Sequence, residues 1–399
     1  MRPGPSNSLV DVSGLRVGHA QRVGGGHLTG TTVVLAPPSG AVAGVDVRGA
    51  APGTRETELL DPRNLVSRVH AVVLSGGSAY GLSAACGVMD RLADAGIGYP
   101  VAGGVVPIVP AAVIFDLGRG GTFRAVPDAT FGTAAYDAAV APDGALAPDG
   151  GAPFTLSFPE SAAPDGDVAA LPPLAAGVPL GRRKRKGNAR GGGLPLSGAS
   201  NGGAVAPGTA SGSIGAGTGA QAGGLAGGVG TASVVLADGT TVAALVVANP
   251  VGSVLDPRDG TVAGARYGLP GEFDYLRPPL QEEIEAWQPE NVPSFNTTIG
   301  VVATDRTLTK AQCGKLAAVA HDGLARAIRP AHTMTDGDTI FALATCARPE
   351  PDHDALQEIL AAGADVFSRA IAHAVLAATG REDAPAYLDV FPSAQRKQS

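Results

Sequence analysis

Cysteine is scarce in this chain of 399 residues. The three cysteines, Cys86, Cys313 and Cys346, stand far apart and form no CxxC pair. A disulfide framework or a zinc site needs cysteines in even number or at closer spacing. The sequence therefore predicts buried, reduced thiols in a cytoplasmic protein.

Long apolar runs are also missing. Residues 1–6 lack the apolar segment that a signal peptide needs. The most apolar stretch, residues 104–117, is interrupted by Pro107 and Pro110 and is too short to span a bilayer. We expect a soluble protein that has no membrane partner.

Positive charge is in deficit, since the formal net charge is −7. This balance argues against nucleic acid as a partner. One basic run, Arg182 to Lys186, lies in a segment of about residues 137–211 that is rich in Ala, Gly, Pro and Asp. Such a run can be a localisation signal or a nucleic-acid patch, but in an acidic protein it favours an exposed, flexible loop.

The remaining composition is that of a globular protein, with 44% hydrophobic and 16% charged residues. Its length allows one large domain or two ordinary ones. Strands are predicted at residues 15–17, 31–36, 40–47, 71–74, 233–236, 241–248, 299–303 and 340–345. Helices are predicted at residues 79–95, 309–328 and 354–378, and the last dozen residues are expected to fray. This order suits a layered domain of sheets and helices.

Two glycine-rich turns invite functional interpretations. The turn at 75–78 precedes a helix whose first amides can hold an anion, but it lacks the full G-x-S-x-G pattern because Tyr80 replaces the last glycine. An ordinary capped strand-to-helix turn is favoured. The segment 215–220 has the spacing GxGxG without a convincing strand before it. Tight backbone packing, or a place in a substrate pocket, is favoured there over dinucleotide binding.

Two threonines stand at the start of a predicted core strand, in the tripeptide Asn296-Thr297-Thr298. If a threonine hydroxyl attacked the preceding carbonyl and water opened the ester, the threonine would become N-terminal. Its freed α-amine, with a pKa of roughly 7.7–8.0, could then act as a base. The same tripeptide reads as a glycosylation site, against which the missing signal peptide counts. The residues alone leave both hydroxyls as candidates.

Eight segments follow one another in the order known from a single enzyme family. The chain resembles the self-processing aminopeptidases and amidases that include DmpA-type L-aminopeptidase/D-amidase-esterases, β-aminopeptidases and nylon-oligomer hydrolases. The matches cover most of residues 8–136 and 212–390. The matching segments are residues 10–19, 53–57, 74–82, 215–220, 228–233, 249–252, 296–305 and 336–339.

The resemblance implies an α/β fold, a four-layer αββα sandwich of the DmpA/ornithine-acetyltransferase type. It implies one domain over residues 1–399 that is cut between Asn296 and Thr297. The resulting α-chain (1–296) and β-chain (297–399) would stay together, as a tetramer of processed heterodimers.

The resemblance also assigns roles to residues. Thr297 would be the nucleophile, and the Asn249 side chain would hold the developing oxyanion. Asp336 and Asp338 would orient the ammonium of Thr297 and tune its pKa. With His332 these carboxylates suggest a metal site, but no fourth ligand stands out, so neither a metal nor a cofactor is expected and His332 is interpreted as structural.

The substrate pocket of the resemblance takes in Phe115, Tyr80 and Gly224. Two of these depart from the family pattern. Gly224 stands where the family often carries a lysine, and no lysine occurs between Lys186 and Lys310. Phe115 stands where some members have a tyrosine, so a hydroxyl donor is lost there.

The function predicted is hydrolysis of small amide bonds through an ester on Thr297. The substrates expected are N-terminal amino-acid residues or ω-amino-acid oligomers such as those of 6-aminohexanoate. Two alternatives stay open. One is an N-acyltransferase, in which an amine accepts the acyl group. The other is an unprocessed binding protein that has lost the chemistry, for which Gly224 is the motivating feature.

Overall fold

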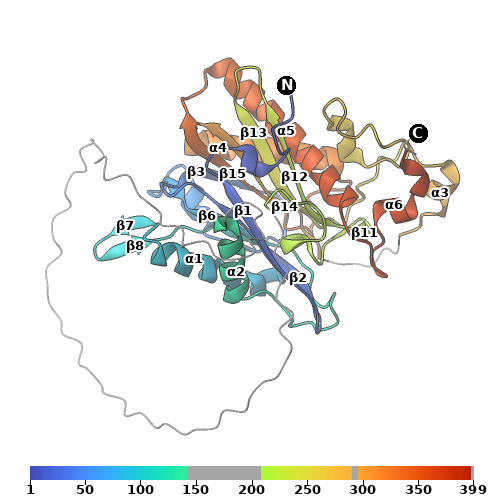
Figure 1. Ribbon diagram of the computed structural model, residues 1–399, viewed down its shortest axis with the longest axis horizontal. Helices are drawn as coiled ribbons and strands as arrows, with labels where there is room; N and C mark the ends of the chain where they lie inside the picture. Colours follow the sequence, from blue (N-terminus) through green and yellow to red (C-terminus); the bar gives the residue numbers. More distant parts are fainter. Residues whose placement is uncertain (142–207, 290–294, 397–399) are drawn as a thin grey trace, which may run out of the picture. The chain divides into compact units, whose positions relative to one another are not determined.

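Two β-sheets pack face to face at the centre of the fold (Figure 1). A computed structural model describes residues 1–141, 208–289 and 295–396. The first sheet has the order β1 (Arg16–Gly24), β2 (His27–Leu35), β6 (Ala71–Ser75), β9 (Ala111–Val113), β4 (Thr54–Arg55). The second has the order β12 (Gly228–Val235), β13 (Thr241–Ala248), β14 (Ile299–Arg306), β15 (Thr339–Arg348), β3 (Ala41–Val47), β5 (Arg68–Val69).

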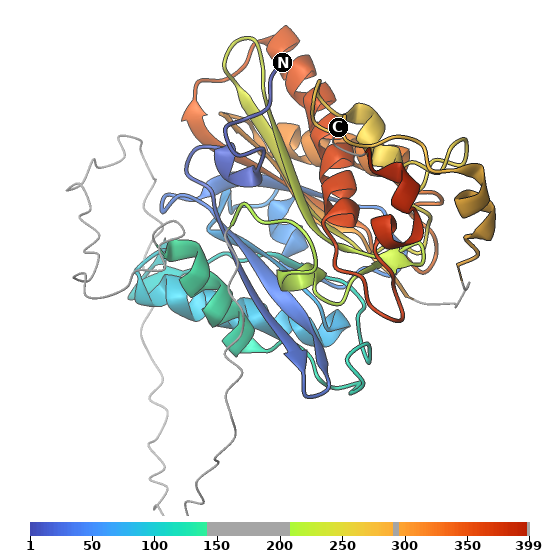
Figure 2. The same cartoon turned by 45° about the vertical axis from the view of Figure 1, so that its right-hand side comes forward.

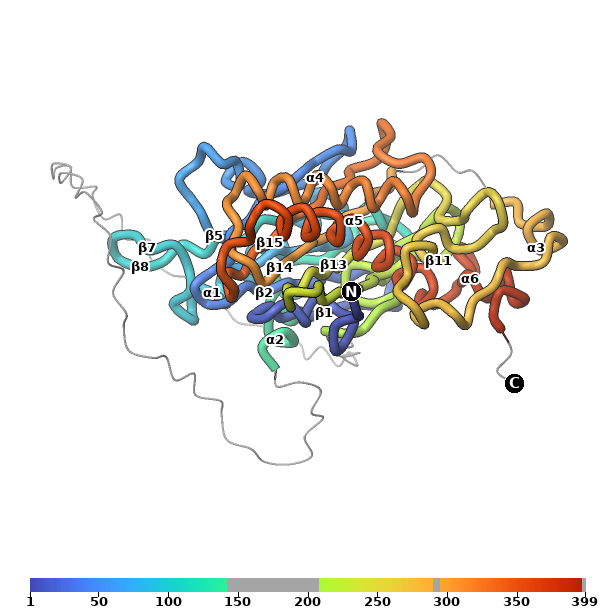
Figure 3. The backbone as a smooth tube through the Cα atoms, turned by 90° about the horizontal axis from the view of Figure 1, so that it is seen from above, coloured from blue at the N-terminus to red at the C-terminus, as the bar shows by residue number. Residues whose placement is uncertain are grey.

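Helices cover the outer face of each sheet (Figures 1 and 2). The first sheet carries α1 (Ala84–Asp94) and α2 (Ala129–Val140), and the second carries α4 (Lys310–Ala327) and α5 (His353–Leu376). Figure 3 shows the layers in order, from α4 and α5 through β13–β15 and β1–β2 to α2. The predicted αββα sandwich is therefore confirmed. Smaller elements lie at the rim: β7 (Tyr99–Val101) with β8 (Gly104–Val106), β10 (Gln221–Ala222) with β11 (Leu225–Ala226), α3 (Gln281–Ala286) and α6 (Tyr387–Val390).

Residues 242–248 of β13 and 299–303 of β14 are uninterrupted apolar runs because both faces of these strands are buried. Alternate residues such as Leu245 and Val301 fill the core between the sheets. Their neighbours Val246 and Val302 pack against the outer helices. An all-apolar strand of this kind is what a position between two apolar layers requires.

Two predicted features of the local structure are wrong. The helix predicted at residues 79–95 begins as a 3₁₀ helix at Ser78–Ser83, and α1 starts only at Ala84. Gly77 and Ser78 both have left-handed backbone angles that turn the chain sharply there. Cys86 is exposed, contrary to the prediction of buried thiols, whereas Cys313 is buried.

The expectation that the last dozen residues fray is wrong for those that the structure describes. Phe391 and Ala394 are fully buried, and Gln395 forms a bridge with Leu276. These residues pack against the helix side of the second sheet, so apolar burial orders the terminus. Of the segment 137–211, α2 contains the first residues, and the basic run at 182–186 lies outside the described residues.

The turn at 215–220 packs backbone against backbone, as predicted. A Cβ placed on Gly217 would lie 2.3 Å from the nitrogen of Val229, and one on Gly219 would lie 2.2 Å from the carbonyl oxygen of Leu28. Only glycine fits such approaches.

Helix α5 is long and apolar enough to cross a membrane by length and composition, but most of that stretch is buried inside the fold. Its one fully buried charge is Arg369, among the residues described. The guanidinium contacts Glu272 Oε2 at 2.7 Å and donates to Ser233 O at 3.0 Å. It also donates to the side chain of Asn7 at 2.8 Å, which fastens the N-terminal segment to the helix.

Arg369→Met is expected to lower the free energy of unfolding by about 3–5 kcal/mol, because Glu272 is left buried without its cation. Burial alone raises the pKa of Glu272, but hydrogen bonds from His373 and Arg369 outweigh it and hold the pKa below its usual value of 4.5. A carboxylate with a lowered pKa contributes stability above its unfolded pKa, and the contribution is lost as it is protonated. The difference between the two proteins should therefore shrink in acid. Urea unfolding at neutral pH and at a pH below 4.5 measures both effects.

Arg63→Met is the matched control, since Arg63 pairs with Asp61 at the surface and its side chain is 88% exposed. Such exposed pairs contribute little to stability because solvent screens them. An equal loss in both variants would contradict the importance of the buried pair.

Candidate active site

The Asn296–Thr297 bond lies at one edge of the second sheet, where β13 ends and its neighbours β14 and β15 begin. Strand β14 pairs antiparallel with β13, and Val247 stands opposite Ile299. Asn249, two residues after Val247, therefore faces Thr297, two residues before Ile299, and the nitrogen of Thr297 donates to the Asn249 carbonyl at 2.9 Å.

The parallel neighbour β15 brings the acidic motif to the same place. Ile299 stands opposite Thr339, so the residues before Thr339 run beside those before Ile299. A bridge between Asn296 and Asp336 continues this pairing beyond the strand. Strand register alone thus assembles three motifs that are far apart in the sequence.

Thr297 and Thr298 have different environments. Thr297 is 5% exposed, and its Oγ1 donates to the carbonyl oxygen of Asn296 at 2.6 Å. The hydroxyl therefore lies beside the carbonyl group that it would attack. Thr298 is fully buried, and its Oγ1 has no hydrogen-bond partner among the described residues. The geometry favours Thr297 over Thr298 as nucleophile.

The side-chain amide of Asn249 has a defined orientation. Its Oδ1 accepts from the Arg119 guanidinium at 2.6 Å and from the nitrogen of Gln221 at 3.0 Å. Its Nδ2 is consequently turned the other way, toward the Phe115 carbonyl at 3.4 Å, which is a long hydrogen bond. A donor that is so weakly engaged is available to negative charge that develops nearby.

The two carboxylates have different partners. Asp338 accepts from the nitrogen of Thr298 at 2.8 Å through Oδ1 and from His332 Nδ1 at 2.8 Å through Oδ2. Asp336 accepts from the nitrogen of Thr333 at 2.6 Å, and its second oxygen is buried without a partner among the described residues. Burial raises the pKa of Asp336, and the charge of Asp338 adds to this shift. Asp338 therefore fixes the start of β14, and Asp336 retains an oxygen for a further donor.

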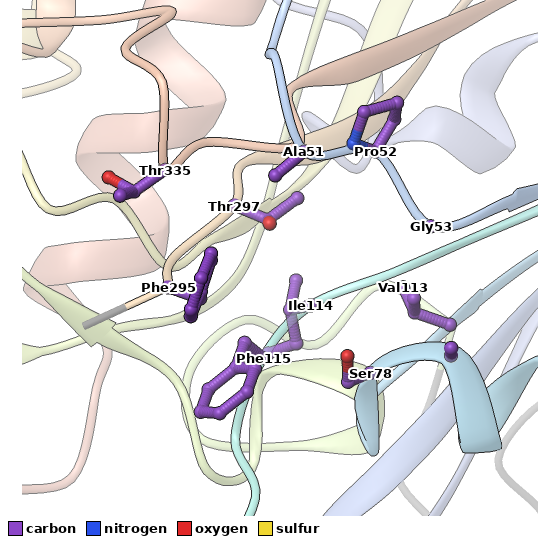
Figure 4. Close-up of a pocket in the computed structure, with 11 residues that line it drawn as sticks. Ala51, Pro52, Gly53, Ser78, Val113, Ile114, Phe115, Phe295, Thr297 and Thr335 are labelled. Atoms are coloured by element: carbon purple, nitrogen blue, oxygen red, sulfur yellow. The ribbon is translucent and has the colours of Figure 1, made fainter.

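A cavity of about 280 Å³ opens at Thr297 (Figure 4). Apolar side chains form most of its walls, among them Val113, Ile114 and Phe115. Phe295 lines it as well, with its ring centroid 5.9 Å from that of Phe115. No charged side chain of the described residues lines this cavity.

Of the three residues predicted for the substrate pocket, Phe115 lines this cavity and the other two do not. Tyr80 is 44% exposed, with the guanidinium of Arg124 at 4.2 Å over its ring. Gly224 has a φ of +90°, and a Cβ placed there would lie 2.6 Å from the Cβ of Pro289. A larger residue at 224 would be strained on both counts.

The turn at 75–78 also has a structural use. The nitrogen of Gly77 donates to Asp116 Oδ1 at 2.6 Å, and that of Ser78 donates to the Ile114 carbonyl at 2.9 Å. These amides therefore already donate hydrogen bonds to groups of the chain itself, which supports the ordinary turn predicted there. The hydroxyl-bearing Ser78 remains at the cavity wall.

The sequence prediction missed one residue of the site, Arg119. It stands between Gly118 and Gly120, one residue after the end of the apolar stretch 104–117. A lone arginine in a glycine turn after a buried strand is the signal that was available. Its guanidinium reaches the side chains of Asn249 and Asn296.

Comparison with known proteins yields one family and several relatives. The profile of peptidase family S58 matches residues 7–146 and 193–384. An uncharacterised aminopeptidase of Mycobacterium leprae is 43% identical, over 98% of this chain and 96% of the relative. A 6-aminohexanoate-oligomer endohydrolase of Kocuria is 28% identical, over 84% of this chain and 74% of the relative. The solved structure of a Burkholderia β-aminopeptidase is similar with a TM-score of 0.62 and 20% identity, over 100% of this chain and 96% of that one.

Gly337→Ala is expected to slow any splitting of the chain before Thr297, by up to about 100-fold. A Cβ at position 337 would lie 2.9 Å from Thr297 Oγ1 and 2.7 Å from the Ala51 carbonyl oxygen, so the hydroxyl must move. The φ of Gly337 lies outside the left-handed region, so alanine adds no backbone strain there. Intact-mass measurement over time gives the rate. Gly314→Ala, where a Cβ meets nothing within 4 Å, is the control; equal rates in both variants would contradict this geometry.

Proposed function

The chain belongs to peptidase family S58 and is a hydrolase of peptide or amide bonds, and we propose that it frees its nucleophile by cutting its own chain before Thr297. One observation carries the proposal. The only hydroxyl of the tripeptide 296–298 that reaches the carbonyl of Asn296 is Thr297 Oγ1, at 2.6 Å.

The self-cleavage proceeds in two balanced steps. The Oγ1 of Thr297 attacks the carbonyl carbon of Asn296, the C–N bond breaks, and the departing nitrogen takes the proton that the hydroxyl loses. Water then hydrolyses the ester between Asn296 and Thr297. The products are a carboxylate on Asn296 and a free α-amine on Thr297.

The freed amine is the base of the later reaction. Before cleavage its nitrogen donates to the Asn249 carbonyl at 2.9 Å, and this acceptor remains beside it afterwards. The unpartnered oxygen of Asp336 supports a role in holding the protonated amine. A base with a pKa of roughly 7.7–8.0 takes the hydroxyl proton and returns it to the leaving group at neutral pH.

Two further residues complete the proposed machinery. The Asn249 Nδ2 donates to the oxyanion that forms as the hydroxyl adds to a substrate carbonyl. Asp338 positions the nucleophile, because it holds the nitrogen of Thr298 and is itself held by His332. This supports the structural role predicted for His332.

The cavity beside Thr297 supports a substrate whose acyl part is uncharged and largely aliphatic. Its walls are apolar apart from hydroxyl groups, and a charged group placed there without a partner would cost several kcal/mol. Linear ω-amino-acid oligomers have such an acyl part, since a methylene chain separates the carbonyl that is attacked from the nearest charged group. The named substrate of the Kocuria relative is an oligomer of this kind.

Thr297→Ala is expected to leave the chain intact and inactive, because it removes both the attacking hydroxyl and the later nucleophile. Thr298→Val should still split and hydrolyse substrate. It removes a buried hydroxyl without a partner among the described residues and keeps the backbone nitrogen that Asp338 holds. Intact-mass measurement of the purified proteins distinguishes the two.

If the unaltered chain stays intact on long incubation, self-cleavage is wrong. If Thr298→Val stays intact and Thr297→Ala splits, the nucleophile has been assigned to the wrong threonine. Both tests use the complete chain.

Substrate preference is tested with 6-aminohexanoate oligomers, β-amino amides and aminoacyl p-nitroanilides. We expect the oligomers and apolar aminoacyl groups to have a kcat/KM at least about tenfold above that of acyl groups with a charged side chain. A preference for charged acyl groups would contradict the assignment of the cavity. Products formed on added amines at the expense of hydrolysis would instead favour the acyltransferase.

A further inference from the structure

Arg119 stands in a turn that places its guanidinium against the side chains of Asn249 and Asn296. The turn follows β9 and is bounded by Gly118 and Gly121, both with left-handed backbone angles. From there Nη1 donates to the carbonyl of Gly219 at 2.6 Å and to Asn249 Oδ1 at 2.6 Å. Nη2 lies 3.4 Å from the Asn296 side-chain oxygen.

The turn itself is anchored in the first sheet. The buried Asp116 accepts from Thr29 Oγ1 and from the nitrogen of Gly77, both at 2.6 Å, and its carbonyl accepts from the nitrogen of Arg119 at 3.3 Å. Burial lowers the pKa of Arg119 to about 10, so the guanidinium is still charged at neutral pH.

A guanidinium has five N–H donors and no acceptor. The end of the Asn249 amide that faces Arg119 must therefore be the oxygen. The opposite end is then Nδ2, whose one hydrogen bond among the described residues is the long one of 3.4 Å to the Phe115 carbonyl at the cavity, so it is open to a further acceptor. Without Arg119, the nitrogen of Gln221 is the one remaining partner of Oδ1 among the described residues. A flipped amide would direct an oxygen, and hence repulsion, at the oxyanion.

We propose that Arg119 is the positioning residue that holds Asn249 with its amide nitrogen toward the oxyanion, both in self-cleavage and in substrate turnover. The proposal rests on the function proposed above. Through the contact with Asn296, the same cation also steadies the residue whose carbonyl is attacked and stands near the carboxylate that hydrolysis leaves on it.

The test is a double-variant cycle with R119M and N249A, read as the rate of chain splitting and as kcat of the processed enzyme. N249A should lose on the order of 10²–10³ in rate, as expected for an oxyanion donor. R119M should lose a similar factor in kcat with little change in KM, because the amide acts in the transition state. The double variant should lose little more than N249A alone, since Arg119 acts through that residue.

Two further variants separate positioning from general stability. R119K keeps one donor to Asn249 and should recover part of the rate. R381M removes a neighbouring guanidinium that also donates to the Gly219 carbonyl, at 3.3 Å. In the part of the chain that the structure describes, this guanidinium has no hydrogen bond to Asn249. R381M should keep most of the rate. The unfolding midpoint of each variant shows whether it is folded.

Losses of R119M and N249A that multiply in the double variant would overturn the proposal, and so would wild-type rates in R119M. An equal loss in R381M would assign the effect to the packing of the Gly219 turn instead. A wild-type chain that neither splits nor hydrolyses amides would refute the proposed function itself, which is a separate outcome.

Discussion

The register of β14 against its two neighbours decides where every group of the site lies. Antiparallel pairing with β13 sets Asn249 opposite Thr297, and parallel pairing with β15 sets Asp336 beside Asn296. A slip of one residue in either pair would exchange the two faces of β14 between the inner core and the outer helices, and it would separate Thr297 from Asn249 and the acidic motif. The two cores that enclose β14 therefore enforce the geometry of the site as well as the fold.

The site residues differ in how far their positions could be predicted from the sequence. Thr297, Asn249 and the acidic pair stand at the ends of apolar strands, so their place follows from pattern and from resemblance to a known family. Arg119 acts across 130 positions of sequence, on the Asn249 side chain, and its turn carries no motif. The predicted pocket residues Tyr80 and Gly224 fail to line the cavity because a sharp turn at Gly77 and the packing of Pro289 decide their surroundings. Such contacts depend on tertiary geometry that periodicity does not contain.

The site divides into a polar and an apolar half. On one side of Thr297 lie the carboxylates and the amide to which we assign the handling of protons and negative charge. On the other lies a cavity with apolar walls. Hydrogen bonds gain strength where water is excluded, so the apolar half intensifies the electrostatics of the polar half. The apolar walls also favour an uncharged acyl group, because a charged group in the cavity finds no oppositely charged partner among the described lining residues.

Before cleavage the chain occupies its own acyl site. The carbonyl of Asn296 lies under the Thr297 hydroxyl, and Phe295 forms part of the cavity wall against Phe115. In the proposed self-cleavage, the first acyl group that Thr297 carries is therefore the chain that ends at Asn296. An external substrate presents its carbonyl at the same atom only after Asn296 and Phe295 have moved aside. The wall that Phe295 provides is then open to change, whereas Val113, Ile114 and Phe115 come from the segment at and just after β9 and remain in place. Selection of the acyl group consequently depends on the side of the cavity that lies far from the cut.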